Sequence, residues 1–354
     1  MWRNLLISAL AFTGAAGAQD ARAGFEYPMT VSLMTAHTHR HAGEPVTAAF
    51  RATVYPAVKL GPNWFAYGAV QAYSTPYFYE ALTSRVRQLH VNVLQAYAGY
   101  SRTGKGWALT VKAGQLTSAF GSFPLRYDDA RNWLIDLPQA YGYYYFPVTV
   151  YGMPGVEADL AWGKVDLRAQ LTNSSPSNPR RLWESDQYAN WTFGGGYTIR
   201  HGFRVGASFA HGPYLHQQHR FYRPGEAAPR TLPATGYGVD AQYGRGRWTF
   251  TGEAQRFQYP YRAMPYFFST TAYGEAKVTL SPRWYFAARS GVRIRTGGRG
   301  TDSAHEVVLA ARLSQHQLIK FGYLAVDGPF SKGARDNVFG IQYVVRINPP
   351  GAAW

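Results

Sequence analysis

Apolar and polar residues alternate with a period of two along most of the chain. Near the C-terminus, Phe339, Ile341 and Tyr343 alternate with Gly340 and Gln342, and the same alternation occurs around residues 189–200, 283–295 and 317–327. Successive side chains of a β-strand point to opposite faces, so each of these segments has one apolar face and one polar or small face. The alternation predicts an all-β protein, but it does not say which face meets water.

The segments and their connections follow a regular order. The predicted strands are sixteen in number, at residues 29–37, 46–60, 63–75, 86–101, 106–117, 150–162, 164–173, 189–200, 202–212, 235–244, 246–258, 267–281, 283–295, 305–314, 317–327 and 337–347. Short turns such as Gly61-Pro62, Gly163-Lys164 and Arg245-Gly246 alternate with longer loops, and glycine and proline are the residues that tight reversals require. The longest loop, residues 118–149, follows the fifth strand.

This organisation predicts a transmembrane antiparallel β-barrel. An even number of strands, with short turns at one end and long loops at the other, is typical of bacterial outer-membrane barrels. A Greek-key sandwich would not sort its connections in this way, and a propeller would show a repeat of about forty residues. In hydrocarbon an open sheet edge leaves backbone groups without hydrogen-bond partners, which is why the sheet must close.

The first residues are expected to be a signal peptide that directs the chain to the bacterial outer membrane. Arg3 precedes an apolar stretch, Leu5 to Ala18, which is too short to span a bilayer, and small residues follow at Ala21 and Ala23. We therefore expect residues 1–23 to be removed and residues 24–354 to form a single barrel domain.

Composition narrows the class further. The chain has no cysteine, which argues against disulfide staples and thiol chemistry. After the signal segment no run of eighteen apolar residues occurs, so membrane-spanning helices are not expected. The net charge of +16 comes from Lys and Arg residues that are spread singly among the strands, and nucleic acid is not an expected partner. The 16% aromatic content suits the interfacial girdles of a barrel.

The segment from Ala113-Gly114-Gln115-Leu116 to Phe120-Gly121, which leads into the longest loop, is similar to a pattern at a strand end in phosphate-selective porins. Over the whole mature chain the architecture resembles sixteen-stranded general porins. The resemblance implies that loop 118–149 folds into the pore as a constriction loop, and that the chain trimerises. Two departures from the family are that the loop contains no Lys, and that Trp354 follows the prolines Pro349 and Pro350 instead of closing the last strand as an assembly signal.

Alternation assigns charged side chains to the inside of the barrel. The predicted basic wall consists of Arg51, Arg289, Arg293, Arg295, Arg312, Lys320 and Arg346. The predicted acidic sector opposite it consists of Glu157, Asp159 and Asp166, and Asp240 and Glu253 are also assigned inward. The constriction loop adds Arg126, Asp128, Asp129, Arg131 and Asp136. Opposed walls would create a transverse field that favours one ion sign, while the alternative is that these charges pair with one another.

The predicted function is a porin, a channel for passive diffusion of small hydrophilic solutes or ions, with a hint of anion preference from the net charge. It needs no cofactor and no metal, and it is not an enzyme. Its expected partners are outer-membrane lipid, lipopolysaccharide, the barrel assembly machinery and two further copies of itself. The alternatives are a barrel enzyme of phospholipase or protease type and a structural or adhesin barrel.

Two side-chain groups carry further hypotheses. His37, His39 and His41 alternate on one face and suggest a metal site, although surface histidines without a ligand role are the simpler explanation. The aromatic run that includes Tyr141 and continues over 143–146 suggests a stacking track for solutes, or packing of the loop against the barrel wall.

Overall fold

The computed structural model describes residues 24–38, 46–75, 77, 88–142, 148–150, 152–177, 189–214, 233–261, 264–295, 300–328 and 336–348. The predicted signal peptide 1–23, the histidines at 39 and 41, the aromatic residues 143–146 and the C-terminal residues 349–354 lie outside them. Among the described residues, no helix reaches the length and apolarity that a membrane-crossing helix requires.

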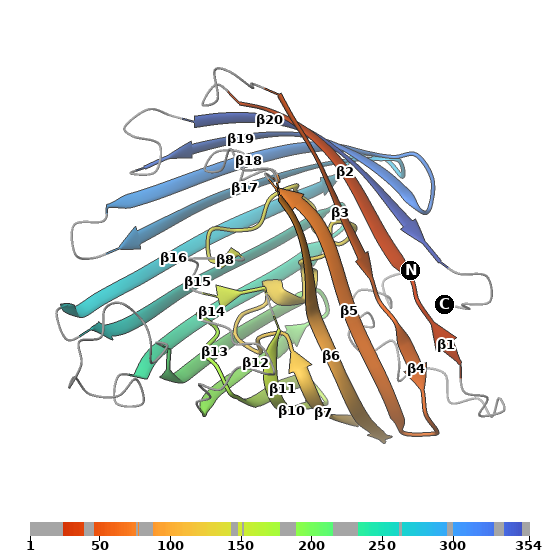
Figure 1. Ribbon diagram of the computed structural model, residues 1–354, viewed down its shortest axis with the longest axis vertical. Coiled ribbons are helices and arrows are strands. Elements are labelled where there is room, and N and C mark those ends of the chain that lie inside the picture. The colour runs from red at the N-terminus through yellow and green to blue at the C-terminus, as the bar shows by residue number, and fades with distance from the viewer. Residues whose placement is uncertain are drawn as a thin grey trace.

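Sixteen antiparallel strands close into a barrel, as the alternation predicts (Figure 1). In chain order they are β2 (Met29–Thr38), β3 (Val46–Val54) with its continuation β4 (Ala57–Lys59), β5 (Trp64–Thr75), β6 (Gln88–Gly104), β7 (Trp107–Leu116), β10 (Met153–Trp162), β11 (Val165–Thr172), β12 (Asn190–Arg200), β13 (Phe203–Pro213), β14 (Pro233–Arg245), β15 (Trp248–Tyr261), β16 (Met264–Thr279), β17 (Trp284–Arg295), β18 (Thr301–Arg312), β19 (Gln317–Asp327) and β20 (Asp336–Ile347). The sheet closes where β20 pairs with β2, from Met29 opposite Ile347 to Thr38 opposite Val338.

The predicted strand 46–60 is interrupted at Pro56. Proline has no backbone N–H to donate to the ladder, so β3 ends at Val54 and β4 resumes at Ala57. The Pro56 carbonyl still accepts a hydrogen bond of 2.8 Å from Gly68 N. A short strand that the sequence did not predict, β1 (Phe25–Glu26), pairs with β4 and precedes β2.

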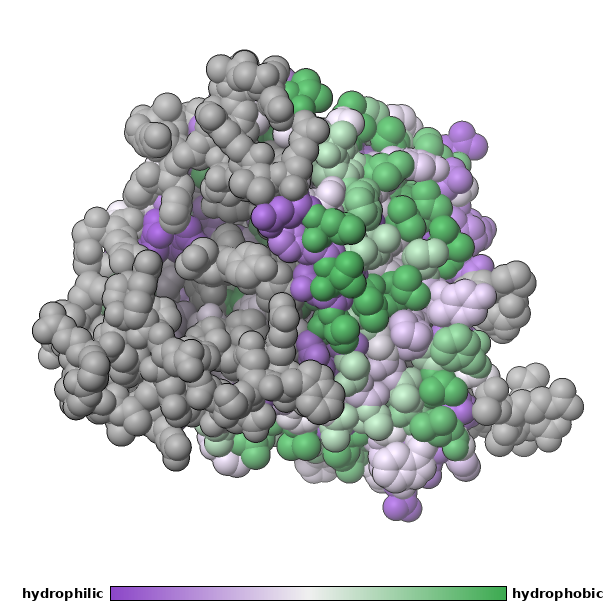
Figure 2. Space-filling view, viewed as in Figure 1, coloured by the Kyte–Doolittle hydropathy of each residue, from purple (hydrophilic) through white to green (hydrophobic). Residues whose placement is uncertain are grey.

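The two faces of the barrel have opposite polarity. Large apolar side chains point outward, and Leu33, Phe50 and Val91 are 55%, 36% and 65% exposed. The inward face carries buried charged residues such as Arg51 and Lys320. Figure 2 shows apolar side chains, in green, gathered on the barrel surface. This distribution is the inverse of a soluble β-protein, and it is the one expected of a barrel that spans a membrane.

Tryptophans mark the end of the barrel that carries the short turns. Trp64, Trp107, Trp248 and Trp284 each begin a strand directly after a turn, Trp162 ends a strand directly before one, and all five are at least 36% exposed. Tryptophan favours the interface between hydrocarbon and water because its ring is apolar and its N–H is polar. The turns themselves are tight, and Gly163 and Gly246 adopt φ of 57° and 60°, which favours glycine.

The connection between β7 and β10, residues 117–152, is here called the inward loop. It contains a short 3-10 helix, η2 (Phe123–Arg126), and two short strands, β8 (Tyr141–Gly142) and β9 (Val148–Thr149), and it packs against the inner face of the barrel (Figure 1). Leu134 and Ile135 are at most 1% exposed and lie in an apolar cluster with Val308 and Leu324 of the wall. The loop is therefore a folded part of the barrel interior.

Candidate functional site: the barrel interior and the inward loop

The alternation of the strands positions the functional side chains. On β17, Arg289 and Arg293 are 6% and 3% exposed, whereas the residues that follow them, Ser290 and Ile294, are exposed on the outer face. On β10, Glu157 is likewise buried, at 6% exposed, and its neighbour Val156 is exposed. Every second residue of a strand therefore belongs to the interior, and the interior is where the charged residues gather.

The last strands hold the inward loop through one lysine and one glutamate. Lys320 of β19 is fully buried, and its Nζ donates hydrogen bonds to the carbonyls of Asp129, Asn132 and Leu134 at 2.7, 3.0 and 2.9 Å. Glu306 of β18 accepts the backbone N–H of Ile135 at 2.8 Å through Oε1, which also accepts the next N–H. The backbone of the loop thus supplies both the acceptors for the cation and the donors for the anion.

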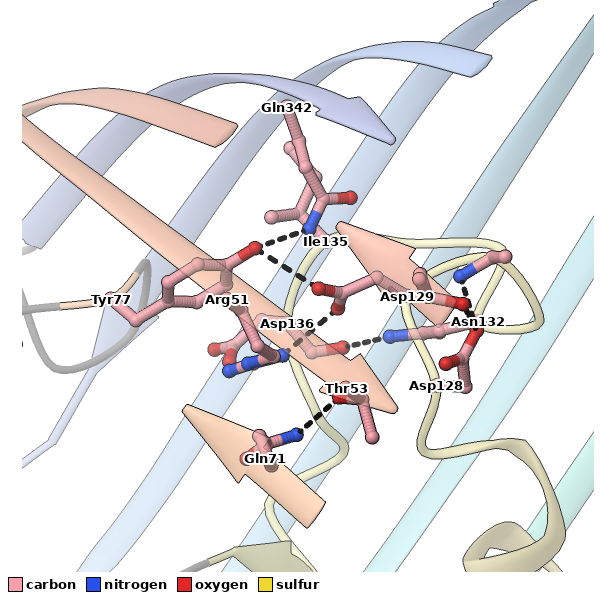
Figure 3. Close-up of polar contacts among 12 residues, drawn as sticks. Arg51, Thr53, Gln71, Tyr77, Asp128, Asp129, Asn132, Ile135, Asp136 and Gln342 are labelled. Atoms are coloured by element: carbon pink, nitrogen blue, oxygen red, sulfur yellow. Dashed lines mark hydrogen bonds and ion pairs between the residues drawn. The ribbon is translucent and has the colours of Figure 1, made fainter. Parts of the chain in front are cut away.

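A second anchor joins the loop to β3 and β20 (Figure 3). Arg51 Nη1 lies 2.9 Å from Asp129 Oδ1, and the Tyr77 hydroxyl donates to the other carboxylate oxygen at 3.1 Å. Gln342 Nε2 donates to the Tyr77 hydroxyl at 2.8 Å, and the Arg51 guanidinium lies 3.9 Å from the centre of the Tyr77 ring. Burial and the Asp129 carboxylate raise the pKa of the Tyr77 hydroxyl, so this group remains a proton donor.

The start of the inward loop is fixed on the opposite wall. Gly121 N donates to Ser208 Oγ of β13 at 2.9 Å, and Arg168 of β11 donates to the Gly121 carbonyl at 3.0 Å. Glu253 of β15 accepts hydrogen bonds from Ser122 and from the Tyr141 hydroxyl. Since the start of the loop is held on this wall and its middle on β3 and β18–β20, the loop crosses the interior from one wall to the other.

The predicted basic wall contains carboxylates that the sequence analysis did not assign to it. Arg289 lies between Glu275 of β16 and Glu306 of β18, at 3.0 Å and 3.6 Å. Arg293 and Arg295 both contact Asp302 of β18, at 2.9 and 2.6 Å. These arginines therefore pair locally, which favours the interpretation that the interior charges pair with one another over the interpretation that they create a transverse field.

The remaining members of that wall lie closer to the turns. Arg312 is exposed at the end of β18, and Arg346 is exposed near the end of β20. Lys320 and Arg51 have the loop contacts described above. The seven residues therefore share the inner face, but only Arg289, Arg293 and Arg295 form one cluster with carboxylates on both neighbouring strands.

The predicted acidic sector contains cations as well. Lys112 of β7, which the sequence analysis did not single out, bonds to Glu157 at 2.7 Å and also to Asp159. Arg204 of β13 bonds to Asp166 at 2.6 Å and to Asp240 of β14 at 2.8 Å. In each group one cation neutralises two carboxylates, which leaves a partial negative excess on this wall. Extending the alternation to every strand would have placed Lys112 inward.

The charged residues of the loop have different environments. Arg126 bonds to Glu275 at 2.8 Å, and Asp128 accepts a hydrogen bond from the Tyr55 hydroxyl. Arg131 is exposed. Burial, and then the charge of Glu306, raise the pKa of Asp136 to about 8.

Aromatic rings form a row on the inner face of β4–β6. The ring centres of Tyr55 and Tyr67 are 6.5 Å apart, those of Tyr67 and Tyr97 are 5.4 Å apart, and Phe65 continues the row 6.2 Å from Tyr97. The predicted aromatic track was assigned to the loop instead, where Tyr141 packs against Phe123 with ring centres 5.2 Å apart. For Tyr141 the packing interpretation therefore holds.

No group of three or more His, Cys, Asp or Glu side chains in the described ranges is placed to hold a metal ion. Of the three histidines that suggested a metal site, His37 lies on β2, whereas the histidines at positions 39 and 41 lie outside the described residues. His211 of β13 contacts Thr235 at 3.0 Å through Nδ1.

Solved structures of porins and of a further outer-membrane protein share this fold. The chain superimposes on an anion-selective porin from Comamonas acidovorans with a TM-score of 0.61 at 9% identity, covering 92% of this chain and 100% of that one. For OprB of Pseudomonas putida the TM-score is 0.63 at 11% identity, with 92% and 94% covered. For OmpT of Vibrio cholerae, also solved in a trimer form, it is 0.61 at 10% identity, with 93% and 99% covered. No protein-family model matches the sequence, and no curated protein is similar to it in sequence. The fold is that of the sixteen-stranded porins.

Proposed function

We propose that this protein is a porin of the bacterial outer membrane, which lets small hydrophilic solutes and ions diffuse through a water-filled barrel. The observation that carries the proposal is the polarity of the closed barrel, with apolar side chains outside and charged side chains inside. A barrel of sixteen strands is wide enough to enclose an aqueous channel. Neither a cofactor nor covalent chemistry is required.

The inward loop would set the size of solutes that pass. It is anchored on β3, β11, β13 and β18–β19, so it divides the barrel cross-section. The charges on either side of it would then select among solutes of permitted size. The overall charge of +16 favours anions.

The proposed setting follows from the same features. Residues 1–23 would export the chain, and the assembly machinery for outer-membrane barrels would insert it. Lipid and lipopolysaccharide would surround the apolar outer face, and a homotrimer is the assembly we expect, since OmpT of Vibrio cholerae is described in a trimer form.

Planar-bilayer recordings of the folded protein test the proposal. A porin gives stepwise, ohmic current increments, and a salt gradient gives a reversal potential that reports anion preference. Arg289→Gln leaves Glu275 and Glu306 without their shared cation, so the reversal potential should shift toward cations. Lys105→Gln removes the same charge from an exposed turn and should leave the potential unchanged.

Two outcomes would contradict the proposal. A correctly folded barrel that carries no current would point to an enzyme or a structural barrel instead. Equal reversal potentials for Arg289→Gln and the parent protein would mean that the interior charges do not govern ion selection.

A further inference from the structure

Cations and aromatic rings alternate between the inward loop and the short turns of β16–β18. The Trp133 ring centre lies 5.0 Å from Arg126 Cζ and 5.0 Å from Lys277 Nζ. The Tyr285 ring centre lies 5.4 Å from Lys277 Nζ and 5.8 Å from Arg312 Cζ. Each ring is thus shared by two cations, and we call these five residues the cation–aromatic ladder.

The strands and the loop fix the ladder in place. Lys277 is third from the end of β16, Tyr285 is second on β17, and Arg312 ends β18, so all three lie near the turns. The Tyr285 hydroxyl donates a hydrogen bond of 3.1 Å to the Trp133 carbonyl, which ties the loop to this wall. Tyr285 is 4% exposed, whereas Lys277 is half-buried and Arg312 is exposed.

The ladder is neutralised at one end only. Arg126 is paired with Glu275 at 2.8 Å. Within the described part of the chain, the Lys277 side chain has neither an ion pair nor a hydrogen bond, and the charged groups that act on it are the cations Arg312 and Arg126. Arg312 has one long contact of 3.4 Å, to the Pro282 carbonyl, and no carboxylate partner among the described residues.

This arrangement differs from that of the paired cations elsewhere in the interior. Lys112, Arg204 and Arg289 each contact two carboxylates. Lys277 and Arg312 instead lie near the same ring, that of Tyr285, and their like charges repel each other, which the negative ring face offsets only in part. An anion that contacts both cations would remove this repulsion, and the half-buried position of Lys277 would strengthen the attraction because water screens charges less there.

We propose that Lys277 and Arg312 bind a small oxyanion, a carboxylate or a phosphate, on the turn side of the inward loop. The planar guanidinium matches two oxygens of such an ion, and the ammonium adds a point charge with rotatable donors. A chloride ion offers a single atom and cannot use the paired geometry. The inference rests on the proposed channel function, because a permeating solute would meet this site beside the loop.

Conductance against salt concentration tests the site. With potassium phosphate or potassium acetate, a binding site makes the conductance of the parent protein saturate, whereas with potassium chloride it should rise further before saturating. Lys277→Gln should raise the half-saturating phosphate concentration about tenfold, the loss expected for one hydrogen bond between charged groups. The double variant with Arg312→Gln should abolish saturation, and Lys105→Gln should behave as the parent protein. Saturation with phosphate but not acetate would identify the ion as phosphate.

Calorimetric titration of phosphate into the folded protein in detergent separates this inference from the channel proposal. Binding that disappears in Lys277→Gln supports the site even if the parent protein carries no current. Normal currents with the same half-saturating phosphate concentration in the parent protein and Lys277→Gln refute the site and leave the porin proposal standing. An equal change in the half-saturating concentrations of chloride and phosphate in Lys277→Gln also refutes the site, because a general electrostatic field would act on both ions.

Discussion

Replacing Lys320 by methionine should loosen the inward loop without disturbing the barrel wall. The ammonium is fully buried and donates to three loop carbonyls, those of Asp129, Asn132 and Leu134. Methionine is similar in length but has no donor, so all three acceptors lose their partner at once. The backbone pairing of β19 with β18 and β20 does not depend on this side chain.

The magnitude follows from the three acceptors. A buried acceptor left without a donor costs about 1–3 kcal/mol. For three acceptors the cost would be about 3–9 kcal/mol. Water that enters the vacated space and the removal of a buried charge both reduce this cost toward its lower limit. We therefore expect a loss of roughly 3 kcal/mol, which increases the population of the detached loop about a hundredfold, since each 1.4 kcal/mol is a factor of ten.

The absence of cysteine from the chain offers a clean assay. Leu134→Cys places one thiol at a loop position that is fully buried, so a thiol reagent reaches it only when the loop detaches. Labelling of this variant should be about a hundredfold faster with Lys320→Met, and unchanged with Lys105→Met on an exposed turn. Labelling rates within twofold of each other, with and without Lys320, would refute the assignment of this lysine as an anchor.

Two further predictions concern the same loop. Because the pKa of Asp136 is raised to about 8, its neutral form stabilises the docked loop, and this contribution is complete below about pH 4 and is lost as the pH rises through 8. Labelling of Leu134→Cys, corrected for the reagent's own pH dependence, should therefore accelerate over that range. In Asp136→Asn the labelling rate should not depend on pH. Gly121 has a φ of 78°, and an added Cβ would collide with Tyr141 and Glu253. Gly106 has a similar φ of 80°, but a Cβ there would meet open space. Gly121→Ala should therefore raise the labelling rate more than Gly106→Ala, and equal effects would show that backbone strain alone is responsible.

The fold was predictable because a barrel wall imposes one strict pattern. Each strand must present apolar residues outward, so the strand predicted at 317–327 coincides with β19 (Gln317–Asp327). The errors fall where the outward residues are polar or where the ladder breaks without a change in the alternation. β18 begins at Thr301, four residues before the predicted start, because its first outward residues, Thr301 and Ser303, are polar although the ladder continues. Pro56 interrupts hydrogen bonding without changing the alternation, so the pattern could not reveal the break.

The interior was predictable in its composition but not in its pairing. Alternation placed Arg289 inward, and it would equally have placed Glu275 and Glu306 inward had those strands been analysed in the same way. Which charges meet depends on strand register, and Arg289 is opposite Glu275 on one side and Glu306 on the other. A shift of two residues would keep every side chain on its face and change every partner. For the same reason, alternation alone cannot show that the Lys277 side chain has no carboxylate partner among the described residues.

In the proposed channel, the two kinds of contact made by the inward loop would separate pore size from ion selection. Leu134 and Ile135 insert among apolar wall residues that include Val308 and Leu324, and burying two such side chains contributes about 3–6 kcal/mol. With the hydrogen bonds from Lys320 added, detachment is a rare event, so in the proposed channel the loop would be a permanent constriction and not a gate. Substitutions among these anchors should therefore change which solutes fit. Substitutions of the two ladder cations Lys277 and Arg312, which are not part of the apolar cluster, should instead change which ions are held while the size limit stays the same.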